Sequence, residues 1–341
     1  MIQPHRNVLC SYHYFKDYDF TRLPDLNIIA DSGAFSAMSQ GATITVDELA
    51  AWAKDWSGVF KWVASLDVIG DPDGTRRNWE RMRDRHELEA IPTIHWGSDP
   101  SLMDWYVEQG VDLMGLGGMV GKSSDKQMRW LVSVFKHQQR HHPDLVFHGW
   151  GVTSPKVLRL PFYSVDSSGW TSVFRFGNVV VRDPRTGRVH KYQADGRDLK
   201  KKPQIARLLR TEYGIDPDDV LISDSSNRQV HARIALAALH VQERQFQRMH
   251  GPVRAPRFGV SYDRDPILDG EAPRAVHGAT AMITNAHPEV AQRQVVAAHT
   301  TPVLHEDNQR DITSRTIAAA DGEPRQFEVT QARITAAKQS A

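Results

Sequence analysis

The strongest constraint on the fold of this chain is a set of short apolar runs that end at an acidic residue or a histidine. Four of them are Asn27–Asp31, Trp62–Asp67, Ile91–His95 and Phe162–Asp166. A buried strand that ends on a titratable side chain presents it at the strand's carboxyl end. Parallel strands with helices between them bring such ends to one rim. The pattern therefore predicts an α/β fold with a polar site at one edge of a parallel sheet.

Strand and helix patterns alternate along most of the chain. We expect strands at 7–11, 27–30, 62–66, 91–95, 113–116, 145–148 and 162–165, with a late candidate at 220–223. We expect helices at 45–56, 74–88, 101–109, 124–137, 155–158 and 227–249. Seven or eight such units in about 250 residues favour a (β/α)8 TIM barrel. An open doubly wound sheet is the alternative.

Composition divides the chain near residue 251. All nine tryptophans lie between Trp52 and Trp170, whereas 252–341 has three aromatic residues and many Ala, Thr, Gln, Arg and Pro. Large aromatic side chains dominate core burial. We therefore predict a barrel domain over 1–251 and a poorly packed or disordered tail over 252–341.

Charge and cysteine content exclude several classes of protein. The net charge is +1, so any nucleic-acid surface must be a local patch. Cys10 is the only cysteine, which excludes a disulfide framework and a cysteine-built zinc site. The chain starts without a signal-peptide stretch, and no run reaches the ~18 apolar residues of a membrane span. We expect a cytoplasmic protein without a membrane partner.

Each strand-end motif has a chemical and a structural interpretation. Asp31-Ser32-Gly33-Ala34-Phe35-Ser36 offers a carboxylate, a turn glycine and an aromatic ring for a planar ligand, or else a helix cap and a packed Phe35. Asp67 can accept hydrogen bonds from the N–H edge of a purine, although the aspartates that follow it are typical of turns. His95 and His148 are hydrogen-bond donors or structural residues, and neither has metal-ligand spacing around it.

The glycine-rich segment Gly115–Ser123 is not a known nucleotide motif. Leu116 stands where a P-loop needs glycine, and Val120 stands where a dinucleotide fingerprint needs its last glycine. The segment is a backbone that can approach a ligand, or a tight turn.

Asp166 ends the last strand of the series. It could be a nucleophile or a general base, and the structural alternative is a turn-forming aspartate. With Asp31 it would make a carboxylate pair of the kind that cleaves glycosidic bonds with retention.

The segment 175–210 carries the strongest charge bias, with eleven basic and three acidic residues. Although generic basic surface is an alternative, its position after Asp166 favours binding of nucleic-acid phosphates beside the site. The candidate phosphate contacts are Arg175, Arg182, Arg185, Lys200, Lys201 and Lys202.

Taken together, these segments resemble the tRNA-guanine transglycosylase superfamily, TIM-barrel enzymes that exchange guanine in nucleic acid for a 7-deazaguanine. The similar motifs follow the family's order over residues 27 to 170. They are Asp31–Ser36, Asp67, Gly117–Gly121, His148–Val152 and Val165–Ser168.

The resemblance implies a role for each site residue. Asp166 would be the nucleophile, Asp31 the general acid/base, and Phe35 with Met119 would sandwich the base. The other implied substrate contacts are Ser32, Asp67, His95, Gly117, Gly118 and His148. The reaction would need no cofactor.

The chain also departs from the family. The family's zinc site needs three cysteines and a histidine, so with Cys10 alone we expect no metal and no zinc subdomain. Lys122 stands in place of an acidic residue, which could change the accepted 7-substituent. The short Asp166–Trp170 segment is most similar to the phage and bacterial branch that acts on DNA. The expected partners are DNA and a free 7-deazaguanine such as the 7-cyano form, in the host cytoplasm if the protein is phage-encoded.

Three alternatives stay open. The chain could be a tRNA-acting transglycosylase, a non-catalytic nucleic-acid-binding subunit on the same barrel, or a barrel enzyme that hydrolyses a small nucleoside or sugar. The sequence leaves the oligomeric state open between a homodimer and an assembly with a partner subunit.

Overall fold

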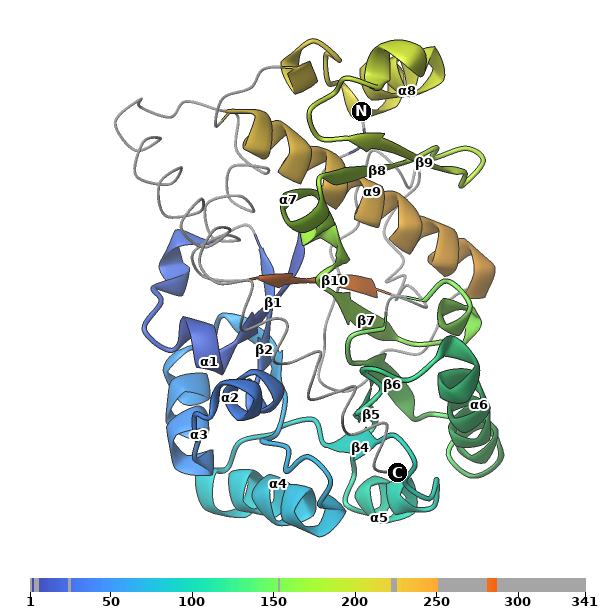
Figure 1. Cartoon of the computed structure of the whole chain (residues 1–341). Coiled ribbons are helices and arrows are strands. Elements are labelled where there is room, and N and C mark those ends of the chain that lie inside the picture. The colour runs from blue at the N-terminus through green and yellow to red at the C-terminus, as the bar shows by residue number, and fades with distance from the viewer. Residues whose placement is uncertain are drawn as a thin grey trace, which may run out of the picture.

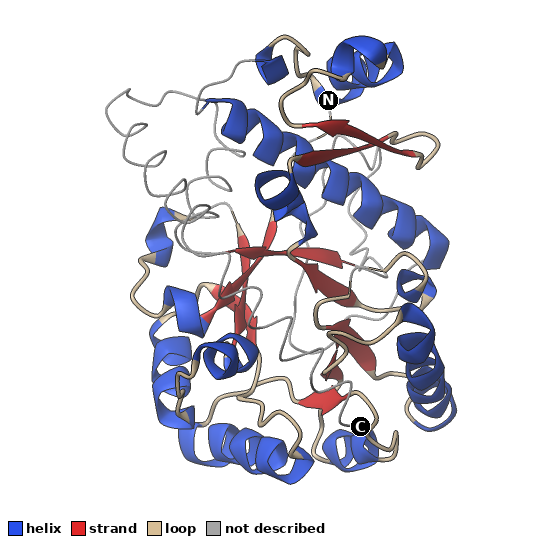
Figure 2. Cartoon of the chain, in the orientation of Figure 1, coloured by secondary structure: helices blue, strands red, loops and turns tan. Residues whose placement is uncertain are grey.

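The computed structural model describes residues 2, 6–23, 26–152, 154–221, 226–250 and 281–286. The fold is mixed α/β: the strands of the main sheet lie centrally and helices lie around them (Figure 1, Figure 2). Within the described residues, every helix is too short or too polar to cross a lipid bilayer.

The main sheet has eight parallel strands in the order β3-β2-β1-β10-β7-β6-β5-β4. Their bounds are β1 Asn7–Ser11, β2 Asn27–Asp31, β3 Phe60–Val63, β4 Thr93–His95, β5 Leu113–Gly117, β6 Val146–Gly149, β7 Ser164–Ser167 and β10 Ala281–Ala286. The helices between them are α1 Tyr12–Phe15, α2 Ala34–Gln40, α3 Val46–Asp55, α4 Pro72–His86, α5 Leu102–Glu108 and α6 Ser124–His141.

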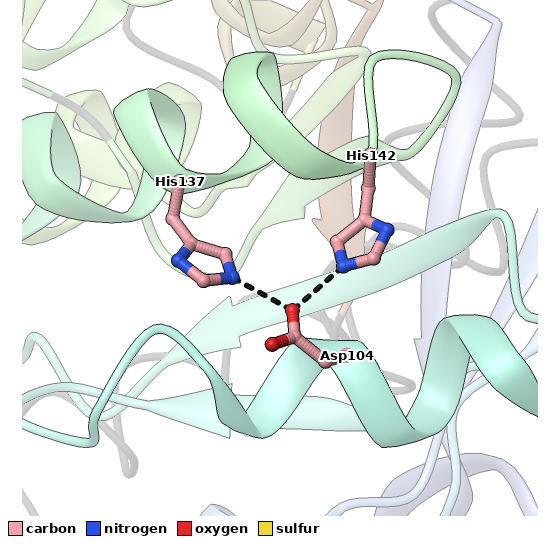
Figure 3. A group of neighbouring side chains, drawn as sticks. All are labelled: Asp104, His137 and His142. Carbon is pink, nitrogen blue, oxygen red and sulfur yellow. Dashed lines mark hydrogen bonds and ion pairs between the residues drawn. The ribbon is translucent and has the colours of Figure 1, made fainter.

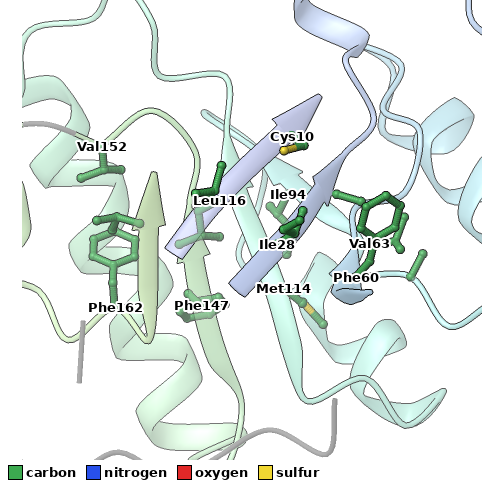
Figure 4. Packing of buried hydrophobic residues seen from close by; sticks show 14 of the residues in the cluster. Cys10, Ile28, Phe60, Val63, Ile94, Met114, Leu116, Phe147, Val152 and Phe162 are labelled. Carbon is green, nitrogen blue, oxygen red and sulfur yellow. The ribbon is translucent and has the colours of Figure 1, made fainter. Parts of the chain in front are cut away.

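The strands bury both faces. On one face, residues such as Ile28, Met114 and Phe147 join a large apolar cluster (Figure 4) that includes helix residues such as Trp52 and Trp79. On the other face, a smaller cluster has no helix residue. It consists of Leu9, Ile29, Trp62, Ala64, Ile91, Leu113, Val146 and Tyr163. Burial of both faces explains why these strands are nearly continuous apolar runs in the sequence.

Side-chain caps start the helices α3, α4 and α6. Thr45 and Glu48 form a capping box on α3, and the Asp71 carboxylate accepts a 2.9 Å hydrogen bond from Gly74 N at the start of α4. Ser123 caps α6 in the same way. These caps satisfy backbone donors that would otherwise lack partners. They fix where each strand-end loop stops, and the Asp71 cap agrees with its predicted turn role.

The two end strands of the sheet order also contact each other. Ala64, directly after β3, forms a parallel bridge with Ile91, just before β4. Two backbone hydrogen bonds accompany the bridge: Ile91 N to Val63 O at 2.8 Å and Ser65 N to Ile91 O at 2.9 Å.

The basic segment forms a second unit. α7 (Ser172–Phe176) leads into an antiparallel hairpin of β8 (Asn178–Arg182) and β9 (Val189–Gln193), followed by α8 (Pro203–Leu208). The long helix α9 (Ser226–His250) packs against this unit, through Ile234 and Val241. Other α9 residues, among them Leu236, belong to the large cluster of the main sheet, so α9 joins the two parts.

Several sequence expectations need correction. β3 begins and ends earlier than the predicted 62–66, because the apolar run continues past the paired residues into the loop. Residues 155–158 form no α-helix; a short 3-10 turn, Val157–Arg159, stands there. Val220 lies in a second such turn, Asp219–Leu221, whereas 222 and 223 are outside the described residues.

The position of β10 also differs from expectation. It lies inside the predicted tail, yet it pairs with β1 on one side and β7 on the other. Its sequence, Ala-Met-Ile-Thr-Asn-Ala, is short and contains no aromatic residue, so composition gave no sign of a central strand. The rest of the predicted tail, from 252 onward, lies outside the described residues.

Candidate active site

Asp31 and Asp166 lie on the same face of the sheet. Asp31 ends β2 two positions after Ile29, which belongs to the cluster without helix residues. Asp166 lies in β7 next to Val165, which packs on the helix-covered face. Because side chains alternate along a strand, both carboxylates are on the face opposite the helices.

The charges of two other carboxylates act on Asp31. Burial, then the charge of Asp166 and then that of Asp67, raise the pKa of Asp31 from 3.8 to about 7. The hydrogen bond from Gly33 N, at 3.1 Å, and the neighbouring Ser11 side chain oppose this shift. A carboxyl with a pKa near 7 exchanges protons readily at neutral pH, which suits a general acid/base.

Gly33 is required where it stands. Its φ is +76°, and a Cβ there would lie 2.7 Å from Ser11 Oγ and 2.8 Å from the backbone N of His13. Only glycine adopts this conformation without strain in so little space. The glycine of the first motif therefore holds the loop close against β1 and directs its N–H to Asp31.

Asp166 has a different environment. Gly151 N donates a 2.6 Å hydrogen bond to Asp166 Oδ1, and His148 Nε2 lies 3.4 Å from the same oxygen. The His148 ring is fully buried, and its Nδ1 lies 2.7 Å from Ser164 Oγ. Burial lowers the pKa of His148, although Asp166 acts in the opposite direction, so the ring stays neutral at pH 7.

Aromatic rings pack together beside Asp166. The Trp150 ring packs edge-on against His148 and Trp62, with ring centres 4.3 and 6.0 Å away, and Trp150 Nε1 donates to Thr93 Oγ1 at 3.0 Å. A Cβ on Gly115 would come within 2.1 Å of Trp150 Nε1. Gly115 is therefore small because Trp150 occupies that space.

Asp67 and His95 form a second polar pair. Asp67 Oδ2 lies 3.6 Å from His95 Nε2, and both side chains are mostly buried. Asp67 Oδ1 and Trp96 Nε1 are also buried, and neither has a hydrogen-bond partner among the described residues. Unpaired buried polar atoms are costly and uncommon, so they mark a place where a ligand can complete the bonding.

The remaining predicted substrate contacts differ in their exposure and in the hydrogen bonds that they already make. Ser32 is buried, and its Oγ accepts from Ala34 N at 3.4 Å; Phe35, in the first turn of α2, is 54% exposed. Met119 is only 3% exposed and packs in the helix-side cluster, so the expected sandwich with Phe35 has no support. The Gly117 carbonyl accepts a hydrogen bond from Trp96 N at 2.8 Å. Gly118, with φ +72°, makes the turn after β5.

Two of the six predicted phosphate contacts already have acidic partners. Arg185 pairs with Glu212 at 3.0 Å, and Lys202 bonds to Asp198. Arg182 is half-buried. Lys200 and Lys201 are exposed and have no acidic partner in the described part of the chain. The side chain of Arg175 lies outside the described residues.

Ser164 is the site residue that the sequence analysis missed. A serine two positions before an aspartate carries no signal of its own, and its contact with His148 depends on the pairing of β6 with β7. The chain matches no family model and no curated protein.

Proposed function

We propose that this chain is a guanine transglycosylase that exchanges guanine in DNA for a 7-deazaguanine, through a covalent bond between Asp166 and the sugar. The observation that carries the proposal is the environment of the two carboxylates. Asp31 has its pKa raised to about 7, whereas Asp166 accepts a backbone hydrogen bond. Two carboxylates in contrasting surroundings are the arrangement that divides acid and nucleophile roles.

The fold supports the proposal if the sheet closes into a barrel. The order of the eight strands begins with β3 and ends with β4, and the Ala64–Ile91 bridge joins those two ends. In a (β/α)8 barrel the carboxyl ends of the strands carry the active site. Asp31, Asp166 and His95 all lie in the last residues of their strands.

The first half of the reaction breaks the bond to guanine. A target guanosine leaves the DNA stack at a cost of a few kcal/mol. Asp166 attacks C1′ of the sugar, the bond from C1′ to N9 breaks, and protonated Asp31 gives its proton to the departing guanine. Gly151 N and neutral His148 hold Asp166 in place without protonating it.

The second half reverses these steps with a different base. Ionised Asp31 takes the N9 proton from the incoming 7-deazaguanine, N9 attacks C1′, and the ester to Asp166 breaks. Each carboxylate returns to its starting form, and one glycosidic bond has replaced another. Asp67 Oδ1, a buried acceptor that has no hydrogen-bond partner among the described residues, would bind an N–H edge of the base.

Exposed apolar side chains follow three of the strands and support a nucleic-acid substrate. Phe35 and Met38 follow β2, Val68 and Ile69 follow β3, and Val120 follows β5. Apolar and aromatic side chains in such loops stack on bases that have left the helix. Lys200 and Lys201 are the exposed cations best suited to bind the phosphate backbone.

The zinc of the transglycosylase family does not fit this chain. Its ligand set needs three cysteines, and Cys10 is alone and buried in the apolar cluster. No step of the mechanism is therefore assigned to that metal. The family uses zinc around tRNA, so its missing ligands favour DNA over tRNA.

Incubation of the protein with duplex DNA and labelled 7-cyano-7-deazaguanine tests the proposal. We expect the label in the deoxynucleoside fraction after digestion, and a covalent protein–DNA adduct on denaturing gels. Asp166→Asn should give neither product. Asp84→Asn, at an exposed carboxylate paired with Arg83, is the matched control and should give both. Labelled tRNA in place of DNA would indicate the tRNA-acting alternative, and incorporation by Asp166→Asn would refute the assigned nucleophile.

A further inference from the structure

A group of three side chains on the outer helices has no role in the proposed reaction. Asp104 lies on α5, His137 lies on α6, and His142 caps the end of α6. Both imidazoles point their Nε2 atoms at one carboxylate oxygen, Asp104 Oδ1, from 2.7 Å for His137 and 2.6 Å for His142 (Figure 3). The three ligand atoms lie within 4.8 Å of one another.

We propose that Asp104, His137 and His142 bind a divalent transition-metal ion of the zinc type. Two imidazole nitrogens and one carboxylate oxygen are the ligands that such ions prefer, whereas Mg²⁺ and Ca²⁺ prefer all-oxygen sites. The site would pin α5 to the carboxyl end of α6. It lies on the helix layer, and it uses none of the residues at the strand ends.

The geometry needs only a small adjustment to hold an ion. Tetrahedral zinc with bonds of about 2.0–2.1 Å keeps two ligand atoms roughly 3.3 Å apart. The two N–O distances must therefore open by roughly 0.6 Å each. The side chains are 18% to 39% exposed, so rotation about their own bonds can provide this change.

The protons on the two imidazole rings must move before the site can hold an ion. In the metal-free form each Nε2 lies at hydrogen-bond distance from a carboxylate oxygen, so each Nε2 carries a proton. A metal ion needs those lone pairs. Each ring must therefore give up the proton on its Nε2 before that nitrogen can bind the ion. Three protein ligands leave a coordination position for water or for His141, whose ring centre is 4.5 Å from that of His137.

The same chain contains a matched control. His86 Nε2 lies 2.7 Å from Asp47 Oδ1, also between two neighbouring helices, but within the described residues the other partner of that carboxylate is Arg81 and not a second imidazole. A single His–Asp pair should not hold an ion tightly. His86→Gln therefore removes one imidazole of the same kind without touching the proposed site.

Calorimetric titration of tag-free, chelator-treated protein with Zn²⁺ tests the proposal. We expect one ion per chain. His137→Gln, His142→Gln and Asp104→Asn should each weaken binding at least ~10-fold, since that loss is found even for residues that merely orient a ligand. His86→Gln should leave the affinity unchanged, and Mg²⁺ should not compete.

Two results would overturn the proposal: no binding up to millimolar Zn²⁺, or equal affinity in the wild-type protein and the three variants. X-ray absorption at the zinc edge on the wild-type protein gives a readout that does not depend on variants folding. A spectrum with two imidazole nitrogens supports the site, and an all-oxygen spectrum refutes it.

Discussion

Two regions of this molecule combine carboxylates with imidazoles, and they differ in what surrounds the carboxylate. At the strand ends, Asp31 has two other carboxylates as neighbours, and with burial they raise its pKa to about 7. On the outer helices, burial raises the pKa of Asp104, but the two histidines outweigh it and hold that pKa below its usual value. The surroundings therefore favour the protonated form of Asp31 and the ionised form of Asp104.

The largest effect is expected when the proposed nucleophile is removed from the first region. Asp166→Asn keeps the shape and the hydrogen bond from Gly151 but cannot form the sugar ester. We expect a loss of transglycosylation on the order of 10⁴-fold or more. Single-turnover rates on DNA measure it. Full activity in this variant would show that Asp166 is not the nucleophile, and the two regions would then not differ in the way proposed.

The second effect is on stability and depends on pH. The pKa of Asp31 is about 7 in the folded protein against 3.8 ordinarily, so between these values the folded state holds a proton that the unfolded chain has lost. Stability therefore falls as the pH rises from about 4 to 7. Asp31→Asn has no charge to bury, and at pH 8 we expect it to be more stable than the wild type by up to about 4 kcal/mol.

Denaturant unfolding of both proteins at pH 4 and pH 8 measures this difference. The advantage of Asp31→Asn should be present at pH 8 and shrink toward zero at pH 4. Equal stability at both values would mean that the Asp31 site is not desolvated. The same variant should lose activity by about 10²- to 10⁴-fold, because it cannot transfer a proton.

A third prediction tests whether the two carboxylates sense each other. Of the two neighbouring carboxylates, Asp166 has the larger effect on Asp31, so Asp166→Asn should lower the pKa of Asp31 from about 7. The fall should be smaller than the shift that burial causes, since burial is the leading cause. Carboxyl infrared or NMR titration measures it. An unchanged pKa of Asp31 in this variant would show that the charge of Asp166 does not act on Asp31.

The smallest effect belongs to the outer region. Asp104→Asn without added metal should destabilise the protein by about 1 kcal/mol or less, because the carboxylate is 39% exposed and solvent screens its ion pairs. The loss should be present at pH 7 and disappear as the pH falls through the lowered pKa of Asp104. Thermal unfolding at several pH values measures it. A gain in stability, like that expected for Asp31→Asn, would contradict the comparison.

The sequence predicts the parallel strands well where burial on both faces makes them apolar, as at Asn7–Ser11. It misses the β8–β9 hairpin because β8 is only five residues long and its partner β9 is mostly polar, with Tyr192 as its one buried residue. Strand ends alone placed Asp31 and Asp166 at one rim, but the contacts of Asp166 with Gly151 and His148 require the actual register.

The outer cluster could not be predicted from spacing. Asp104 and His137 are 33 positions apart, and they meet only because α5 and α6 lie side by side (Figure 3). Neither residue belongs to an apolar run or a motif. Contacts between neighbouring helices depend on how each helix rotates on the sheet, and a single sequence does not contain that angle in readable form.

The position of β10 has a consequence for how the chain folds as it is made. β1 leaves the ribosome long before β10, yet the strand between β1 and β7 ends at Ala286. Until then, the backbone groups of β1 and β7 that face this gap have no strand to pair with. Such exposed edges recruit other chains. Newly made protein would therefore need protection from aggregation until its late residues arrive.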